Sequence, residues 1–419
     1  MIDMHALVRE LYPQCRSITG DGLRATLRRI GKEIPLTLHE VPTGTKVLDW
    51  TVPREWNIRD AYVANANGQR IVDFKRSSLH ILNYSTPVRQ RMSLAELRPH
   101  LHALPDQPEL VPYRTSYYAE AWGFCLSQRQ LDSLKEGEYE VVIDATLEAG
   151  NLSYGECLLP GETDDEVLIS CHSCHPSLAN DNLSGIAVAI ALAQWIQAAP
   201  RRLSYRLLFI PGTIGSITWL ARNESVVPRI KHGLVLSCVG DRGHPTYKKS
   251  RRGDAVVDRA AQHILAGREH QILEFVPYGY DERQYCSPGF NLPVGCFMRT
   301  PNGRFPEYHT SADNPELVTP ESLADSYHTL VALLEILEHD RRFINTNPKG
   351  EPQLGRRGLY KPTGGAHLPG FEMAMLWVLN FSDGEHSLLD IAERAQVPFA
   401  TIRQAADALR GAGLLVEAA

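Results

Sequence analysis

Apolar residues along this chain follow two periodicities in turn, which predict alternating strands and helices. A short apolar run covers residues 167–170, and a longer run with helical periodicity covers residues 183–198. Further strands are predicted at 139–145, 203–210, 233–239 and 294–298, and further helices at 4–12, 22–32, 254–266 and 320–337. Strands that alternate with helices indicate an α/β fold, with a mostly parallel sheet covered on both faces.

A different pattern, of short strands and turns, occupies residues 45–130. Asn67-Gly68 separates strand-forming residues 61–63 from 70–74, and another strand is predicted at 79–84. Asn-Gly between strand formers is a strong hairpin signal. This part of the chain therefore reads as a β-rich insert or cap.

The pattern changes again near residue 345, where Pro- and Gly-containing segments indicate a linker. Three helices are predicted at 371–380, 387–395 and 398–412, followed by an apolar strand at 414–416, and this order is typical of a winged helix. From residue 371 to the end there are three basic residues and seven acidic ones. Phosphate binding requires the opposite balance, so we expect this domain to dock on protein, in the same chain or a second copy, rather than on DNA.

Length and composition indicate an ordinary globular protein of two or three domains. The chain has 419 residues and a net charge of -6, which argues against a nucleic-acid-coating protein. No apolar run approaches the length of a membrane helix, and the N-terminus lacks the apolar core of a signal peptide. Eight scattered cysteines then favour reduced thiols, so a cytoplasmic location is expected, with no membrane partner.

Candidate metal chemistry lies between the strand at 167–170 and the helix after it. His172 and His175 follow the strand, and Asp181 lies near the start of the helix. Ligands of open α/β sheets bind at the carboxyl ends of strands, and imidazole with carboxylate is typical of zinc sites. Cys171, Cys174 and His175 also spell C-x-x-C-H, which fits haem attachment or a redox dithiol. Haem attachment requires export, and Cys171 is better interpreted as a small buried side chain of the strand.

Two more segments add a carboxylate and a histidine to this set. Asp241 follows the predicted strand at 233–239, and His309 lies in a polar loop before the helix at 320–337. A carboxylate at the position of Asp181 can bridge two metal ions, which together polarise a carbonyl group and activate water.

The chain resembles the two-zinc aminopeptidase superfamily, and closely its branch with a β-rich insert and a C-terminal winged helix. The resemblance rests on the residues 15–20, 49–50, 55–58, 115–118, 172–185, 281–285 and 307–311. It implies a zinc-exopeptidase-like mixed sheet flanked by helices, formed by residues 1–44 and 131–344, with the insert at 45–130 and the winged helix at 345–419. It also implies one or two zinc ions: His172 resembles a terminal ligand, Asp181 the bridging carboxylate, Asp241 a further ligand and His309 the histidine of the second metal. His175 is a possible extra ligand.

The chain departs from the superfamily at Gly212. Relatives are expected to carry there a catalytic glutamate, which acts as general base, whereas this chain reads Ile210-Pro211-Gly212-Thr213. Loss of a general base typically costs about 10²- to 10⁴-fold in rate. Three explanations remain open: an engineered inactive variant, a natural non-hydrolytic descendant, or a replacement base such as Glu307 or Glu282.

Charged residues after Tyr280 suggest a substrate pocket. Asp281 and Glu282 could hold an amino group, while Arg283 and Arg299 could hold a carboxylate. Our first hypothesis is a zinc-dependent amidohydrolase that acts on a small peptide or amino-acid conjugate. A homo-oligomer is a possible assembly. The alternatives are a catalytically silent binding or assembly protein and a metal-using acyl transferase or cyclase.

Overall fold

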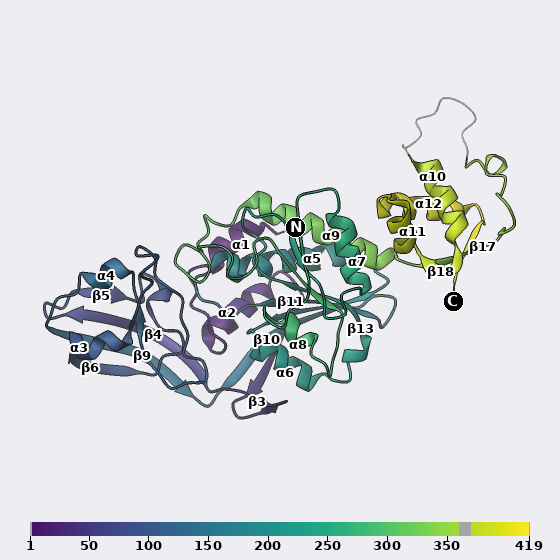
Figure 1. Ribbon diagram of the computed structural model, residues 1–419. Helices are drawn as coiled ribbons and strands as arrows, with labels where there is room; N and C mark the ends of the chain where they lie inside the picture. The colour runs from purple at the N-terminus through teal and green to yellow at the C-terminus, as the bar shows by residue number, and fades with distance from the viewer. Residues whose placement is uncertain (1, 360–369, 419) are drawn as a thin grey trace. The chain divides into compact units, whose positions relative to one another are not determined.

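The larger part of the chain is built on one eight-stranded sheet in the computed structural model, which describes residues 2–359 and 370–418 (Figure 1). The strand order is β1-β10-β12-β11-β13-β16-β14-β15. Strands β11, β12, β13 and β16 run parallel, whereas β1, β10 and β14 pair in antiparallel fashion. The strands are β1 (Thr37–Pro42), β10 (Asn151–Leu159), β11 (Glu166–His172), β12 (Ser204–Ile210), β13 (Ile230–Leu236), β14 (Thr246–Lys248), β15 (Gln271–Leu273) and β16 (Val294–Met298). The mixed α/β fold expected from the sequence is confirmed.

Helices cover both faces of this sheet. Helix α5 (Gly185–Gln197) connects β11 to β12, and α6 (Ile214–Arg222) connects β12 to β13. Because β12 and β13 lie on opposite sides of β11, right-handed connections place α5 and α6 on opposite faces, as Figure 1 shows. Helix α1 (Met4–Leu11) packs beside α5, α8 (Glu282–Tyr285) beside α6, and α2 (Asp21–Ile30) against β10. Every residue of β11 and β12 is buried, as covered parallel strands require.

A buried ion pair ties three strands of the sheet together. Arg206 of β12 lies between Glu166 of β11 and Glu156 of β10, and its Nε is 2.6 Å from Glu166 Oε2. Arg206→Met is expected to lower the free energy of unfolding by about 3–5 kcal/mol, because two carboxylates would then be left buried without their cation. Urea unfolding followed by circular dichroism measures this loss.

The control for that measurement is Arg59→Met. Arg59 pairs with Asp144 on the surface of the insert, so its removal is expected to leave the urea midpoint almost unchanged. Equal midpoint shifts for the two variants would contradict the assignment of the buried pair.

The insert forms a sheet of its own, in the order β5-β4-β9-β6. The hairpin predicted at Asn67-Gly68 is confirmed, since β4 (Glu55–Asn65) and β5 (Arg70–Asp73) pair around it. The prediction for residues 139–145 was wrong in one respect: they belong to β9 (Glu138–Glu148), which pairs with β4 and β6 (Val88–Ser93) and not with the large sheet. The strand predicted at 79–84 was also wrong, because residues 78–80 form a helical turn. The smaller elements are β2 (Lys46–Val47), β3 (Trp50–Thr51), α3 (Leu94–Leu97), β7 (Leu101–His102), β8 (Phe124–Cys125) and α4 (Gln128–Asp132).

The C-terminal part has the helices and strands of a winged helix, as predicted. Helices α10 (Phe371–Phe381), α11 (Leu388–Ala395) and α12 (Phe399–Gly411) accompany a sheet in the order β18-β17-β19, formed by Asp383–Ser387, Arg342–Asn345 and Leu415–Glu417. Two further helices of the chain are α7 (Val256–Leu265) and α9 (Pro320–His339). The three arginines between residues 371 and 418 are engaged: Arg403 pairs with Glu335, Arg410 with Asp407, and Arg394 lies over the ring of Phe381.

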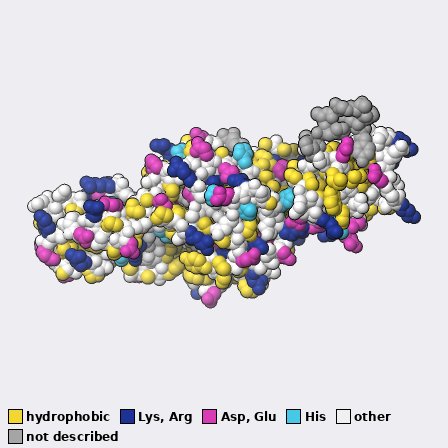
Figure 2. Space-filling model, turned by 45° about the horizontal axis from the view of Figure 1, so that its top comes forward, with side chains coloured by type: hydrophobic (Ala, Val, Ile, Leu, Met, Phe, Trp, Pro, Cys, Tyr) yellow, Lys and Arg dark blue, Asp and Glu magenta, His cyan; other side chains and the backbone are white. Residues whose placement is uncertain are grey.

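Surface charge, cysteine state and helix hydropathy each bear on an expectation from the sequence. On the face shown in Figure 2, basic and acidic side chains are interspersed. All eight cysteines are free. Within residues 2–359 and 370–418, no helix combines the length and the apolar character needed to cross a bilayer.

Candidate metal centre

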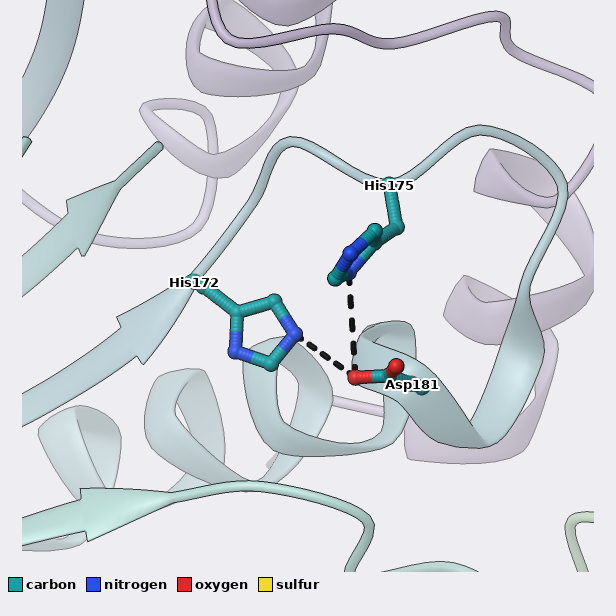
Figure 3. A group of neighbouring side chains, drawn as sticks. All are labelled: His172, His175 and Asp181. Carbon is teal, nitrogen blue, oxygen red and sulfur yellow. Dashed lines mark hydrogen bonds and ion pairs between the residues drawn. The ribbon is translucent and has the colours of Figure 1, made fainter. Parts of the chain in front are cut away.

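Two histidines and one aspartate meet at the carboxyl end of β11 (Figure 3). His172 Nε2 is 2.7 Å from Asp181 Oδ1, and His175 Nδ1 is 3.7 Å from the same oxygen. The three side chains offer ligand atoms that all lie within 4.8 Å of one another, and all three residues are buried. The sequence placed these residue types together at a strand end, and the structure brings them to one point.

The loop after β11 is fixed by buried polar groups on several sides. Arg16 donates a 2.8 Å hydrogen bond from Nε to the carbonyl oxygen of His175. Asn182 donates to the carbonyl oxygen of Leu236 at the end of β13. The carboxylate of Asp313 accepts hydrogen bonds from the backbone amides of residues 179–181. These bonds satisfy the backbone where the strand has ended, so Asp181 is held in place by its surroundings.

His309 approaches Asp181 from another loop. Its Nε2 lies 3.1 Å from Asp181 Oδ2, the oxygen that His172 and His175 do not face. Its backbone has φ of 54°, a left-handed conformation that is uncommon for residues other than glycine and often found at functional sites. Asp181 is thus contacted by imidazoles at both carboxylate oxygens, and its role as a bridging carboxylate stays a prediction.

The insert holds the loop that carries His309. The backbone amide of Tyr113 donates to the carbonyl oxygen of His309, and the amide of Ser311 donates to the carbonyl oxygen of Val111. The ring of Tyr113 also meets the rings of both His175 and His309 edge-on, with centroids 5.0 Å apart in each case. The cap predicted from the sequence therefore contributes directly to the geometry of the site.

Electrostatics favour a charged carboxylate beside neutral imidazole. Burial lowers the pKa of His175 well below its usual value, and the charge of Asp181 opposes this shift only in part. Burial by itself would raise the pKa of Asp181, but the neighbouring His175 and His172 hold that pKa well below its usual range. An ionised carboxylate and a neutral imidazole are the protonation states in which these groups bind metals.

The residues present fit a metal ion. His175 Nδ1 is buried and has no hydrogen-bond partner among the described residues, although Asp181 lies nearby. A buried nitrogen without a partner is costly in a protein interior unless something else satisfies it. Imidazole and carboxylate are the donor set that suits zinc and related divalent metals.

Asp241 is not part of the three-residue group. Its Oδ1 accepts hydrogen bonds from the amide of Gly243 and the hydroxyl of Thr300, and its Oδ2 accepts from the side-chain amide of Asn180 and the amide of Thr300. A metal bound by Asp241 would compete with these donors. Its role as a ligand stays a prediction.

The ring of Tyr280 fills the space that a side chain at residue 212 would occupy. A Cβ added to Gly212 would lie 2.0 Å from Cε1 and 2.7 Å from the hydroxyl oxygen of Tyr280. The same ring stacks on His172, with centroids 3.7 Å apart. Gly212 is therefore required for the close approach of Tyr280, a reason for glycine that the sequence did not reveal.

Two family models together account for almost the whole chain. Residues 5–340 match the family described as "Domain of unknown function (DUF4910)", and residues 341–417 match a model described as "winged helix-turn-helix". The chain belongs to the DUF4910 family.

Similar proteins of known structure support the aminopeptidase-like fold of this DUF4910 member. A curated relative from Clostridium acetobutylicum, 50% identical over 99% of this chain and 96% of its own length, is named "Putative polysaccharide biosynthesis protein with aminopeptidase-like domain". The crystal structure of a "putative peptidase" from the same species has a TM-score of 0.95 at 49% identity, over 99% of this chain and 96% of that one. A zinc aminopeptidase from Bacillus subtilis has a TM-score of 0.59 at 13% identity, over 80% of this chain and 93% of that one. The resemblance recognised in the sequence is confirmed at the level of fold and family.

The two candidate replacement bases are placed differently in this DUF4910 member. Glu282 is buried and forms a 2.8 Å ion pair with Lys248, and it also accepts hydrogen bonds from the amide of Tyr280. It therefore fixes the loop that carries Tyr280. Glu307 is half-buried. Its backbone carbonyl oxygen accepts hydrogen bonds from the amide and the hydroxyl of Thr310.

The proposed substrate-binding residues do not form one cluster. Asp281 is buried beneath the surface, where it accepts a 2.7 Å hydrogen bond from Ser216, and burial raises its pKa to about 7. Arg299 pairs with Asp325 at 2.6 Å. Arg283 lines a cavity beside Tyr280, and its buried Nε has no hydrogen-bond partner among the described residues. Of the four residues, Arg283 is thus the one placed to meet a ligand.

Three residues of the site were missed by the sequence analysis. Tyr280, Tyr113 and Asp313 all touch or position the histidines and Asp181, yet each is a common residue in a loop without a distinctive spacing. Only their occurrence inside or next to segments that carry the family resemblance could have drawn attention to them.

Proposed function

We propose that this protein is a zinc-dependent, aminopeptidase-like amidohydrolase that acts on a small peptide or amino-acid conjugate. The observation that carries the proposal is the buried group of His172, His175 and Asp181 at the carboxyl end of β11. The relative named as having an aminopeptidase-like domain and the fold of the zinc aminopeptidase from Bacillus subtilis support it.

The proposal assigns metal-binding and positioning roles to residues of the site. His172, Asp181 and His309 would hold one or two zinc ions, with His175 and Asp241 as further ligands. Zinc at such a site supplies Lewis-acid polarisation of a substrate carbonyl group. Tyr280 stacks on His172 and Tyr308 on His309, with ring centroids 3.7 Å and 4.0 Å apart, and these contacts fix the orientation of the imidazoles.

A second candidate function is a binding protein on the same fold that lacks hydrolytic activity. Tyr280 favours this candidate, because its ring fills the space in which a catalytic side chain at residue 212 would lie. Glu282 cannot readily replace that side chain, since its carboxylate is committed to Lys248.

Hydrolysis of aminoacyl anilides and dipeptides with and without added zinc tests the proposed enzyme. We expect slow, zinc-dependent release of the amine by the wild-type chain, and its loss in His172→Ala, because this histidine contacts Asp181 most closely. The control is His244→Ala, which changes an exposed histidine paired with Glu269. Activity that survives both zinc removal and His172→Ala would exclude a metal-dependent reaction at this group.

A further inference from the structure

A cavity of about 230 Å³ is lined in part by Tyr280, whose ring also stacks on His172. Its lining includes Trp50 of β3, Tyr117 and Tyr118 of the insert, Gly212, Tyr280 and Arg283. Small-molecule sites usually measure about 300–1,000 Å³, so this cavity has room for one ring with short substituents.

One wall of the cavity is aromatic and open to solvent. Trp50 is 44% exposed and Tyr118 is 53% exposed, and their ring centroids lie 5.3 Å apart. Tyr118 has φ of 65°, so its backbone is held in a left-handed conformation that is unfavourable for a bulky residue. Large aromatic side chains kept at a surface in this way supply apolar faces on which a flat ring can pack.

The lining of the cavity also contains one charged side chain. Arg283 is the one charged residue among the described residues of the lining, and its buried Nε makes no hydrogen bond to the described chain. Asp281 at the start of its helix interacts with Arg283 electrostatically, but the carboxylate of Asp281 is buried and accepts a hydrogen bond from Ser216. A guanidinium group in the wall of a cavity can bind a carboxylate through two parallel hydrogen bonds.

From this arrangement we infer that the cavity binds a ring-bearing carboxylate of single-residue size. The carboxylate contacts Arg283, and the ring packs against the exposed faces of Trp50 and Tyr118. Both an N-acyl aromatic amino acid and a uronic acid have this chemistry. The inference deepens the proposed function and rests on it in one respect: the substrate's reacting bond would have to reach the histidine group past Tyr280, which borders both.

Binding of four probes to the purified full-length chain tests the inference. Calorimetry and tryptophan fluorescence are used with N-acetylphenylalanine and its amide, and with glucuronate and glucose. At least one carboxylate probe is expected to bind more tightly than its neutral analogue, by about 10- to 100-fold, because a hydrogen bond to a charged group is lost in the analogue. Preference for N-acetylphenylalanine identifies an amino-acid ligand, and preference for glucuronate identifies a sugar acid.

Variants separate the cavity from other sites. Arg283→Met is expected to remove the preference for the carboxylate, and Trp50→Leu is expected to weaken both members of the preferred pair. Arg91→Met, which changes an exposed arginine of β6, is expected to bind as wild type. Equal affinity for carboxylate and neutral probes, or unchanged binding in Arg283→Met, would overturn the inference.

His309→Ala distinguishes failure of the cavity from failure of the metal site. This variant is expected to lose zinc affinity and to keep probe binding, because His309 does not line the cavity and its ring contacts Tyr113, His175 and Tyr308. Probe binding by a chain that never takes up zinc would refute the proposed enzyme and leave the cavity assignment standing. Zinc uptake without carboxylate preference would refute the cavity assignment alone.

Discussion

Asp181→Asn is expected to lower the affinity of the protein for zinc by at least about 100-fold. The substitution keeps the shape of the side chain but removes a buried negative charge that faces three imidazoles. Loss of a carboxylate that merely orients a ligating histidine costs about 10- to 100-fold in metal affinity, and a bridging carboxylate should cost more. Competition with a fluorescent zinc chelator measures the affinity.

The control for this experiment is Asp144→Asn, which changes an exposed carboxylate in the insert. Because zinc stabilises only the folded state that binds it, the melting temperature should rise with added zinc in wild type and Asp144→Asn, but not in Asp181→Asn. Zinc affinity unchanged in Asp181→Asn would show that the buried group is not a metal centre.

The double variant Gly212→Glu with Tyr280→Ala is expected to hydrolyse aminoacyl amides at least about 10²-fold faster than wild type, which is the usual contribution of a general base. Because the sequence places Gly212 where relatives are expected to carry the catalytic glutamate, Gly212→Glu alone would be expected to restore the base. The structure corrects this expectation, because a Cβ at residue 212 would lie 2.0 Å from the ring of Tyr280. Gly212→Glu alone should therefore lose stability, by about 1–3 kcal/mol, and gain no activity.

Gly212→Glu with Tyr280→Phe is the matched control, since phenylalanine retains the ring atoms that obstruct the glutamate. Initial rates on aminoacyl anilides with zinc, together with urea unfolding, compare the three variants and wild type. Equal rates in the two double variants would show that space at residue 212 does not limit the reaction. Strong hydrolysis by wild type, unchanged in every variant, would show that another residue is the base.

Several strands of the large sheet could be predicted from the sequence because their burial on both faces gives them an easily recognised apolar pattern. Strands β11, β12 and β16 lie within a residue or two of their predicted ranges, since buried parallel strands are short uninterrupted apolar runs. The same apolar pattern led to an error at strand β9, which was assigned to the large sheet. Its apolar residues 141–143 look like a central strand in sequence, and an apolar run does not specify which partners a strand will have.

The candidate site could be predicted only as far as residue types at element ends allow. His172 and Asp181 were placed together because a strand end and a helix start are neighbours in an α/β sheet. Tyr280 could not be placed, because it reaches Gly212 from a loop 68 residues further along the chain, and no periodic pattern encodes such an approach. His175 was considered only an extra ligand, although its ring proved to lie with His172 at the same carboxylate oxygen.

The segment from Tyr113 to Tyr118 has an additional consequence, because its two ends serve different sites. Tyr113 holds the backbone of His309 and touches the rings of two histidines, while Tyr117 and Tyr118 line the cavity with Arg283. The hydroxyls of Tyr113 and Tyr117 are joined by a 2.9 Å hydrogen bond. A shared segment offers a physical route for coupling between two binding equilibria, and any coupling free energy between two sites is reciprocal. Whatever factor an occupied cavity imposes on metal affinity, a bound metal must impose on the affinity of the cavity.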